Sequence, residues 1–306
     1  MSKLLVIIHN DLKVIYGQFL SERNIITFLK IQLYLFVGFF KRVFFYIKIY
    51  KKNSINEYEL RKIKNSDTLF IFGSGSSINE ISDEEYKNIG KHDVAGFSKT
   101  ILLKKVNYTY YLDRGGASNK GALFYQKKFC KYFVKKISEN KYFNNTIFIL
   151  PSTYVASFTN FLFGDKIFPI TKKFFLFITN RFNSKYPTSK FEHGLSHRAG
   201  SLCDVINFGV IMNYKRIVLV GVDLYNNQYF FCPPNKTTFW DHDKNDYTFS
   251  DKNHKGTSYN SQHNTVNLGI IDILKNWNIY LKKKQVSLEV YNKKSLLAEY
   301  LKIYNS

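Results

Sequence analysis

A serine- and glycine-rich turn is the first segment of this sequence that could bind a ligand. The run Gly73-Ser74-Gly75-Ser76-Ser77 follows an apolar segment at 68–72 and precedes a predicted helix at 79–89. Such a turn offers unpaired backbone N–H groups and the positive end of a helix dipole, which together suit a phosphate. The dinucleotide fingerprint is incomplete, because Ile78 stands at the third glycine position, and no Gly-Lys-Ser/Thr of a Walker loop follows. The turn therefore predicts either a phosphate site or an ordinary strand-to-helix connection.

A second group of polar side chains follows the strongest strand signal in the chain. The run RIVLVG at 216–221 predicts a central strand, and Asp223, Tyr225 and Tyr229 come soon after it. Because open α/β sheets bind ligands outside the carboxyl ends of their strands, these side chains are candidates for a binding site. A lone tyrosine is structural by default in a chain that has 23 of them.

Histidines supply the candidate general bases, because an imidazole with a pKa of about 6.5 exchanges protons at neutral pH. The candidates are His193, His197, His242, His254 and His263. His263 lies just before a helix predicted from Thr265, and each of these histidines could instead be a surface or capping residue. Asp241 and Asp243 have the Asp-x-Asp spacing of a metal–nucleotide site, but their polar surroundings favour a solvated loop, so we expect no metal site.

The elements that must position these residues alternate between strands and helices. Strands are predicted at 68–72, 93–97, 108–112, 146–150, 216–221 and 286–290, and helices at 79–89, 122–137, 199–212, 265–281 and 295–303. This alternation predicts an α/β fold with a mainly parallel central sheet. Two segments do not fit the pattern. We expect lid elements at about 152–197, which is rich in Phe without a clear period, and at 228–262, a long polar segment.

The charge of the chain indicates an anionic partner. Lys plus Arg exceed Asp plus Glu by 45 − 23, a net +22, which suits a nucleic acid, a membrane surface or a phosphorylated substrate. An alternative is that part of the excess reflects genome composition, since Lys and Asn are abundant. Hydrophobic residues at 45% exclude general disorder, and three Cys without metal-like spacing argue against a disulfide scaffold or a Cys-based zinc site.

Residues 1–64 differ from the rest of the chain and are predicted to be a separate basic, aromatic-rich region. The uncharged run at 31–40 is too short to span a bilayer, and Lys30 and Lys41 border it. An interfacial helix fits better, with apolar side chains in the acyl boundary and Lys or Arg, including Arg42, at anionic headgroups. The alternative is a helix packed on the catalytic core, which would occupy 65–306, or on a partner subunit. No secretory signal is evident.

Four blocks of the sequence together resemble the bacterial sialyltransferases of glycosyltransferase family 42. They are FGSGSSINEIS (72–82), RAGSLCDVINFGVIMNYKRIVLVGVDLY (198–225), QHNTVNLGIIDIL (262–274) and SLEVYNKKSLLAEYL (287–301). The likeness covers residues 67–303, and it lies in the order and spacing of the blocks. It implies a Rossmann-like, modified GT-A fold with a lid over the donor site.

The resemblance also implies a reaction. The expected enzyme is an inverting glycosyltransferase that needs no metal or other cofactor and moves sialic acid, or a related nonulosonic acid, from a CMP-sugar to a hydroxyl of a surface glycan or glycolipid. On matching positions, His263 is the base, Tyr225 and Tyr229 donate hydrogen bonds to the departing phosphate, and Arg198 is an active-site arginine. Ser74, Ser98 and Asp113 stand where the family has Asn, which leaves the donor sugar open. The full predicted donor-binding set is Gly73, Ser74, Gly75, Ser76, Ser77, Ser98, Asp113, Ser201 and Gly221.

Several alternatives and partners accompany this interpretation. The donor could be CMP-Kdo or another CMP-sugar. The chain could instead be a nucleotide-binding oxidoreductase of the Rossmann type. It could also be a basic nucleic-acid-binding protein, although the sequence has no recognised module for nucleic-acid binding. The expected partners are the donor, a glycan or glycolipid acceptor, an anionic membrane surface and possible further copies of the chain, with no nucleic acid. The expected location is peripheral, on the cytoplasmic face of a bacterial inner membrane, in capsule or lipooligosaccharide biosynthesis.

Overall fold

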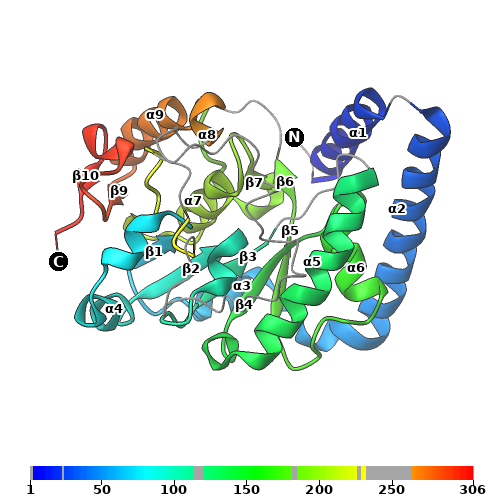
Figure 1. Cartoon of the computed structure of the whole chain (residues 1–306), viewed down its shortest axis with the longest axis horizontal. Coiled ribbons are helices and arrows are strands. Elements are labelled where there is room, and N and C mark those ends of the chain that lie inside the picture. Colours follow the sequence, from blue (N-terminus) through cyan, green and yellow to red (C-terminus); the bar gives the residue numbers. More distant parts are fainter. Residues whose placement is uncertain are drawn as a thin grey trace.

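A computed structural model describes residues 3–22, 24–113, 120–180, 185–225, 229–231 and 264–305. Its centre is one eight-stranded sheet in the order β10-β9-β8-β1-β2-β3-β4-β5, in which every neighbouring pair is parallel (Figure 1). The strands are β1 (Thr68–Phe72), β2 (Asp93–Phe97), β3 (Tyr110–Leu112), β4 (Ile147–Pro151), β5 (Phe174–Phe177), β8 (Arg216–Val220), β9 (Ser287–Val290) and β10 (Lys302–Ile303). The predicted α/β fold with a parallel sheet is confirmed.

Helices cover both faces of the sheet, as a parallel sheet requires. They are α3 (Glu57–Lys62), α4 (Asp83–Ile89), α5 (Lys120–Glu139), α6 (Ser157–Gly164), α7 (Ser201–Ile211), α8 (Asn264–Asn267) and α9 (Ile270–Lys283). Side chains alternate along β1: Leu69 and Ile71 pack with α7 and α9, whereas Phe70 and Phe72 pack with α4, α5 and α6. The two cores therefore lie on opposite faces of one sheet.

The chain order creates a point at which the winding of the sheet reverses. From β1 the chain proceeds through β2, β3, β4 and β5 to one edge, and it then returns to place β8 on the other side of β1. Phe72 pairs with Gly96 of β2 and Val220 of β8, so the carboxyl ends of these three strands are level. Ligands of open α/β sheets bind at such a switch point.

Three sequence predictions differ from the structure at the level of elements. The helix expected at 79–89 is a 3₁₀ turn, Ser76–Glu80, followed by α4, whose capping box joins Ser82 and Glu85. The helix expected at 265–281 is divided between α8 and α9, because Gly269 adopts a left-handed conformation. The helix expected at 295–303 is wrong: a 3₁₀ turn, Leu296–Glu299, precedes the edge strand β10.

The lid expected at about 152–197 needs a larger correction. Every residue of α6 is buried, and β5 is an edge strand of the main sheet. A second, two-stranded parallel sheet follows, made of β6 (Thr179–Asn180) and β7 (Leu195–Ser196). The phenylalanines lack a clear period because α6 and β5 are both buried on more than one side, so no polar face marks their orientation. The other expected lid, 228–262, lies outside the described residues except for 229–231.

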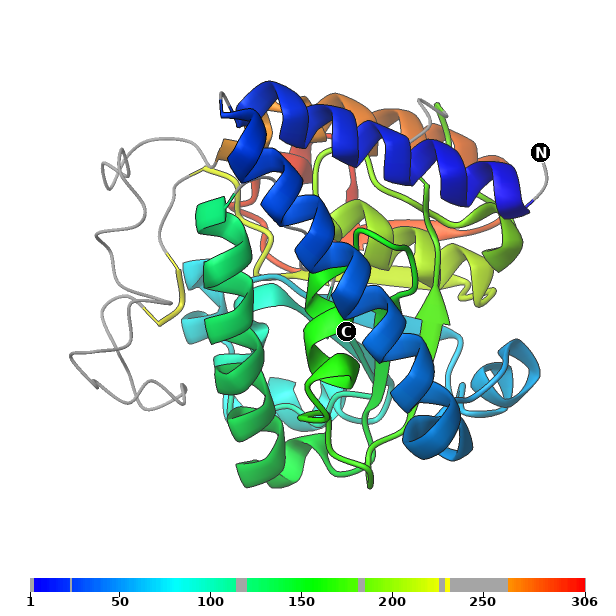
Figure 2. The same ribbon diagram turned by 90° about the vertical axis from the view of Figure 1, so that its right-hand side faces the viewer.

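Residues 1–64 form no separate region. Helices α1 (Lys3–Ser21) and α2 (Ile25–Phe45) lie across one outer face of the molecule, and the chain then enters the core (Figure 2). Tyr50 and Leu60 belong to the two hydrophobic cores, and the Ile55 N–H donates to the Phe174 carbonyl oxygen beside β5. The predicted boundary at 64 is therefore not a break in the fold.

Helix α2 is apolar on two faces. Its inner face packs on the rest of the protein, and its outer face is exposed. Ile31 and Leu35 are buried, and the buried Arg42 guanidinium donates to the carbonyl oxygens of Thr153 (3.1 Å) and Ser152 (2.9 Å). Burial lowers the pKa of Arg42 to about 10. Arg42 thus anchors the helix to the core, and the expectation that it faces headgroups is wrong. Among the described helices, none is both long and apolar enough to cross a membrane.

Candidate functional site

A cavity of about 240 Å³ lies at the switch point, outside the carboxyl ends of β1, β2 and β8. Three loops build it: 73–75 after β1, 97–99 after β2 and 221–224 after β8. The start of α7, the residue Tyr229 and the start of α9 complete its wall. The predicted site residues that line it are Gly73, Ser74, Gly75, Ser98, Ser201, Gly221 and Tyr229. Seven residues chosen from the sequence therefore converge on one cavity, although they come from separate parts of the chain.

The loops after β1 and β8 are joined along their backbones. The Gly73 N–H donates to the Val220 carbonyl oxygen and the Gly75 N–H to that of Gly221, both at 2.7 Å. A Cβ on Gly73 would lie 2.5 Å from the Gly221 oxygen, so the close approach of the two loops requires glycine here. The N–H groups of Gly73 and Gly75, which the sequence predicts as phosphate donors, therefore donate to carbonyl oxygens of the protein itself.

Asp223 completes this junction. Its buried carboxylate accepts hydrogen bonds from the Ser77 N–H at 2.9 Å, from the Ser77 hydroxyl, and from the Asn292 amide at 3.2 Å. The main chain before it is also held, because the Ser295 hydroxyl donates to the Val222 carbonyl oxygen at 2.6 Å. Asp223 is therefore a brace for the loops, and its bonding explains why Ser77 is buried rather than exposed to the cavity.

Helix ends and a lysine bring positive charge to the cavity, which the Asp223 carboxylate also lines. Helices α7 and α9 both begin at its wall, after Gly200 and Gly269, and neither has a side-chain cap. Uncapped N-termini carry unpaired N–H groups and the positive end of the helix dipole. Lys99 lines the cavity as well. The arrangement suits an anionic ligand, and it takes its donors from α7 and α9 rather than from the loop after β1.

Lys99 is a site residue that sequence reasoning missed. Its ammonium lies 3.9 Å from the centre of the Tyr229 ring and 5.4 Å from that of Phe231, and these two rings are stacked at 5.2 Å. Cation–π contact of this kind fixes the lysine beside the cavity. The only sequence signal was its position directly after a predicted strand, next to Ser98.

Two residues of the wall have a strained backbone. Ser98 and Leu224 have positive φ angles of 55° and 64°, in the left-handed region that favours glycine. Such conformations cost on the order of 1–3 kcal/mol each and tend to cluster at functional sites. The Tyr111 hydroxyl donates to the Ser98 carbonyl oxygen and helps to hold that strained turn.

Five predicted site residues do not line this cavity: Ser76, Ser77, Asp113, Arg198 and Tyr225. Tyr225 is near it, on the other side of the loop junction. Burial and the Asp223 carboxylate raise its pKa, while hydrogen bonds with Ser76 and Asn292 lower it. Asp113 is buried at the end of β3, and Arg198 is exposed one residue before the wall.

The predicted base, His263, lies outside the described residues, as do His242, His254 and the Asp241–Asp243 pair. His193 is near Glu192, at 3.6 Å, away from the cavity. His197 has a stronger partner: its Nδ1 lies 2.6 Å from a carboxylate oxygen of Asp204, which is completely buried in the first turn of α7. This pair holds the segment that leads into the cavity wall at Ala199 and Gly200.

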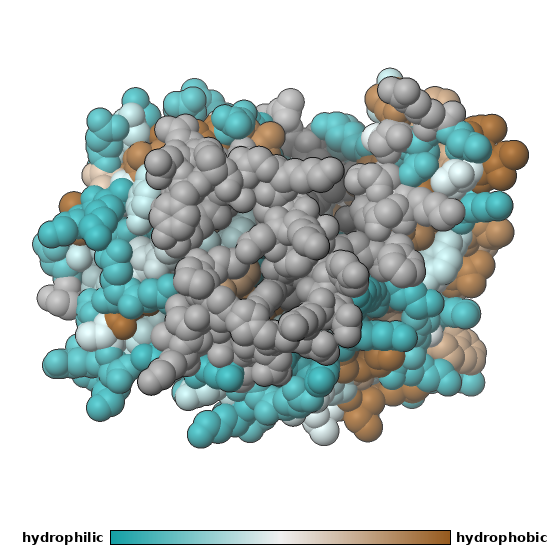
Figure 3. Space-filling view, in the orientation of Figure 1, coloured by the Kyte–Doolittle hydropathy of each residue, from teal (hydrophilic) through white to brown (hydrophobic). Residues whose placement is uncertain are grey.

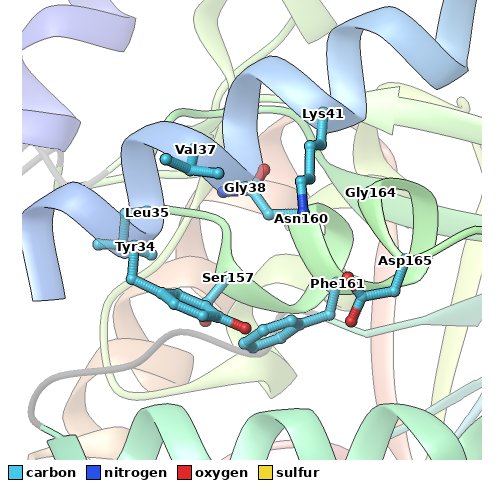
Figure 4. Close-up of a pocket in the computed structure, with 10 residues that line it drawn as sticks. All are labelled: Tyr34, Leu35, Val37, Gly38, Lys41, Ser157, Asn160, Phe161, Gly164 and Asp165. Carbon is cyan, nitrogen blue, oxygen red and sulfur yellow. The ribbon is translucent and has the colours of Figure 1, made fainter.

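A second, smaller cavity of about 60 Å³ lies between α2 and α6 (Figure 4). Tyr34 and Phe161 point toward each other across one end of it, with ring centres 5.4 Å apart, and Lys41 and Asp165 are at the other end. It has room for only one or two water molecules. We therefore regard the switch-point cavity as the candidate site.

Among the described residues, no group of three or more His, Cys, Asp or Glu side chains has a geometry that could hold a metal ion. Comparison with protein-family models, with curated proteins and with solved structures gives no match to this chain. The functional assignment must therefore come from the site itself.

Proposed function

We propose that this chain is an inverting glycosyltransferase that moves sialic acid, or a related nonulosonic acid, from a CMP-sugar to a hydroxyl group of a surface glycan or glycolipid. One observation carries most of the support: seven residues selected for a CMP-sugar site meet at a single cavity at the switch point of a parallel α/β sheet. Ser98, Ser201 and Tyr229, which come from three separate segments of the chain, all line this cavity.

The charge distribution of the cavity fits the leaving group of this reaction. When a CMP-sugar loses its sugar, negative charge develops on the phosphate, and fixed donors that face this charge lower the barrier. Lys99, the uncapped start of α7 and the phenol of Tyr229 are the described groups that suit this role. The net charge of +22 would also attract a doubly anionic donor.

Two further roles in the proposal belong to residues that are not among the described residues of the cavity wall. His263 would take the proton of the acceptor hydroxyl, and a positioned base typically accelerates such a step about 10²–10⁴-fold. Tyr225 and Arg198 would act on the phosphate if the bound donor extends past the loop junction. We place the enzyme on the cytoplasmic face of a bacterial inner membrane, where a glycolipid acceptor would be available.

The test is release of CMP, measured with CMP-Neu5Ac and with CMP-Kdo, with and without EDTA. We expect turnover of at least one donor and no loss in EDTA. The His263→Ala variant should lose transfer but keep CMP binding, and His193→Ala, which changes a histidine away from the cavity, should behave like the unmodified protein. Absence of turnover with every CMP-sugar, or bound NAD(P) in the purified protein, would refute the proposal.

A further inference from the structure

The outer faces of α1 and α2 carry a continuous set of exposed apolar side chains. Those of α1 lie at spacings of three, four, seven and eight residues, and those of α2 continue the same helical pattern, so each helix has one apolar stripe toward solvent. Their members are Ile8, Leu12, Tyr16, Phe19, Leu20, Ile25, Ile26, Leu29, Leu33, Phe36, Val37, Phe40, Val43, Phe44 and, just after α2, Ile47, and each is between 38% and 64% exposed. We call these residues the α1–α2 surface.

The α1–α2 surface is large. The two helices have 19 and 21 residues, about 30 Å each at 1.5 Å per residue, and both lie across the face that is turned to the viewer in Figure 2. In the space-filling view the corresponding brown side chains gather along the edge where α1 and α2 lie (Figure 3). Water-soluble proteins rarely expose an apolar area of this extent unless something binds it.

Lysines border the α1–α2 surface. Lys30 and Lys41 are exposed and eleven residues apart, close to three whole turns, so they lie on the same side of α2, and Lys48 follows with its ammonium 4.2 Å from the Phe44 ring. Helix α5 lies beside α2 on this face and presents further exposed lysines (Figure 2). These are Lys127, Lys128, Lys131 and Lys135.

Acidic side chains hardly offset this charge. Residues 3–53 contain nine Lys or Arg and only two acids, Asp11 and Glu22, a difference of +7. Asp11 is turned inward, where its carboxylate accepts hydrogen bonds from the N–H groups of Tyr154 and Val155. A second copy docked by a two-fold axis would bring the same lysines face to face, because such an interface uses the same patch on both chains.

We infer that the α1–α2 surface lies flat on an anionic lipid bilayer, with its apolar side chains at the acyl boundary and the bordering lysines at the headgroups. Interfacial helices bind in this way, to a depth of about 5–10 Å, and each lysine near an anionic surface adds to the attraction. Helix α1 also contacts β6, which follows the carboxyl end of β5. The membrane would therefore lie toward the same edge of the sheet as the candidate site. The inference rests on the location in the proposed function, but its test is independent of sugar transfer.

The test is co-sedimentation of the full chain with vesicles of phosphatidylcholine alone or mixed with phosphatidylglycerol. We expect binding to the mixed vesicles that weakens in high salt. Phe36→Gln with Phe40→Gln, and separately Lys30→Glu with Lys41→Glu, should each weaken it about tenfold or more. Leu268→Gln with Ile279→Gln, and Lys282→Glu with Lys283→Glu, change exposed residues on or beside α9 and should bind as the unmodified chain does.

Two results would overturn the inference. One is equal sedimentation of the surface variants and their controls, provided that circular dichroism shows all of them folded. The other is concentration-dependent self-association without lipid that Phe36→Gln with Phe40→Gln abolishes, which would assign the surface to a second copy. CMP release with a soluble acceptor, measured on the same variants, separates this result from the proposed reaction: a chain that binds vesicles but releases no CMP would refute the reaction alone.

Discussion

At the scale of single residues, the cavity depends on side chains whose partners are far away in the sequence. Asp223 and Ser77 are 146 positions apart, and Lys99 meets the ring of Tyr229 after a separation of 130 positions. Asp223 follows a strong strand signal, and this position predicts a side chain that contacts a ligand. Its hydrogen bonds show a structural role, since the carboxylate closes the junction of the two loops.

Lys99 provides a prediction at this scale. Lys99→Gln removes the only lysine among the described residues that line the cavity, so the KM for the donor should rise about tenfold, which corresponds to about 1.4 kcal/mol. Lys99→Arg keeps the charge and the contact with the Tyr229 ring and should lose much less. Steady-state kinetics with a CMP-sugar measure both, with Lys87→Gln on the exposed side of α4 as the control. An unchanged KM in Lys99→Gln would mean that the donor phosphate binds elsewhere.

At the scale of elements, two βα connections form the site because their loops touch. The N–H groups of Gly73 and Gly75 bind the end of β8, and the turn that follows is a short 3₁₀ helix rather than a long α-helix. A dinucleotide-binding helix would instead begin directly at this loop and point its N-terminus at a pyrophosphate. This geometry disfavours the alternative of a dinucleotide-dependent oxidoreductase.

The loop junction gives the second prediction. A Cβ on Gly75 would collide with the Asp223 carboxylate and lie 2.8 Å from the Gly221 carbonyl oxygen, so Gly75→Ala should lower the free energy of unfolding by about 2 kcal/mol or more. Gly17→Ala is the matched control, because nothing lies within 4 Å of its Cβ and α1 should gain up to about 1 kcal/mol. Urea titration of both variants measures the difference. Equal stability of the two would show that the loops can separate without cost.

At the scale of the whole molecule, the N-terminal segment belongs to the fold and also provides an outer surface. Arg42 and the inner face of α2 attach the helix to the 152–155 segment, and Tyr50, Ile55 and Leu60 help to fill the cores on the two faces of the sheet. The outer sides of α1 and α2 are turned toward solvent. The sequence interpretation of a separable membrane region was therefore wrong about the boundary, while its membrane contact stays a prediction.

Truncation tests this division of the chain. Removing residues 1–22 should leave a folded protein, whereas removing 1–60 takes away Tyr50, Ile55 and Leu60, at roughly 1.5–3 kcal/mol for each buried side chain. That loss is comparable with the total stability of a typical domain, about 5–15 kcal/mol, so the shorter chain should unfold or aggregate. Thermal unfolding followed by circular dichroism distinguishes the two truncated chains. A cooperative transition at an unchanged temperature after removal of 1–60 would contradict this account.

The sequence by itself determined six strands of the central sheet, β1, β2, β3, β4, β8 and β9, and the helices α5 and α7, because alternating or continuous apolar runs depend on neighbours within a few residues. The strands at 93–97 and 216–220 agree with their predicted bounds within one residue for this reason. Only the tertiary structure decided that α6 and β5 are core and that Ser77 faces Asp223. The tertiary structure also places Lys99 at the cavity. It shows that one apolar face of α2 packs on protein and that the other is exposed. Such facts depend on which distant segments pack together, and the spacing of residues along the chain does not contain that information.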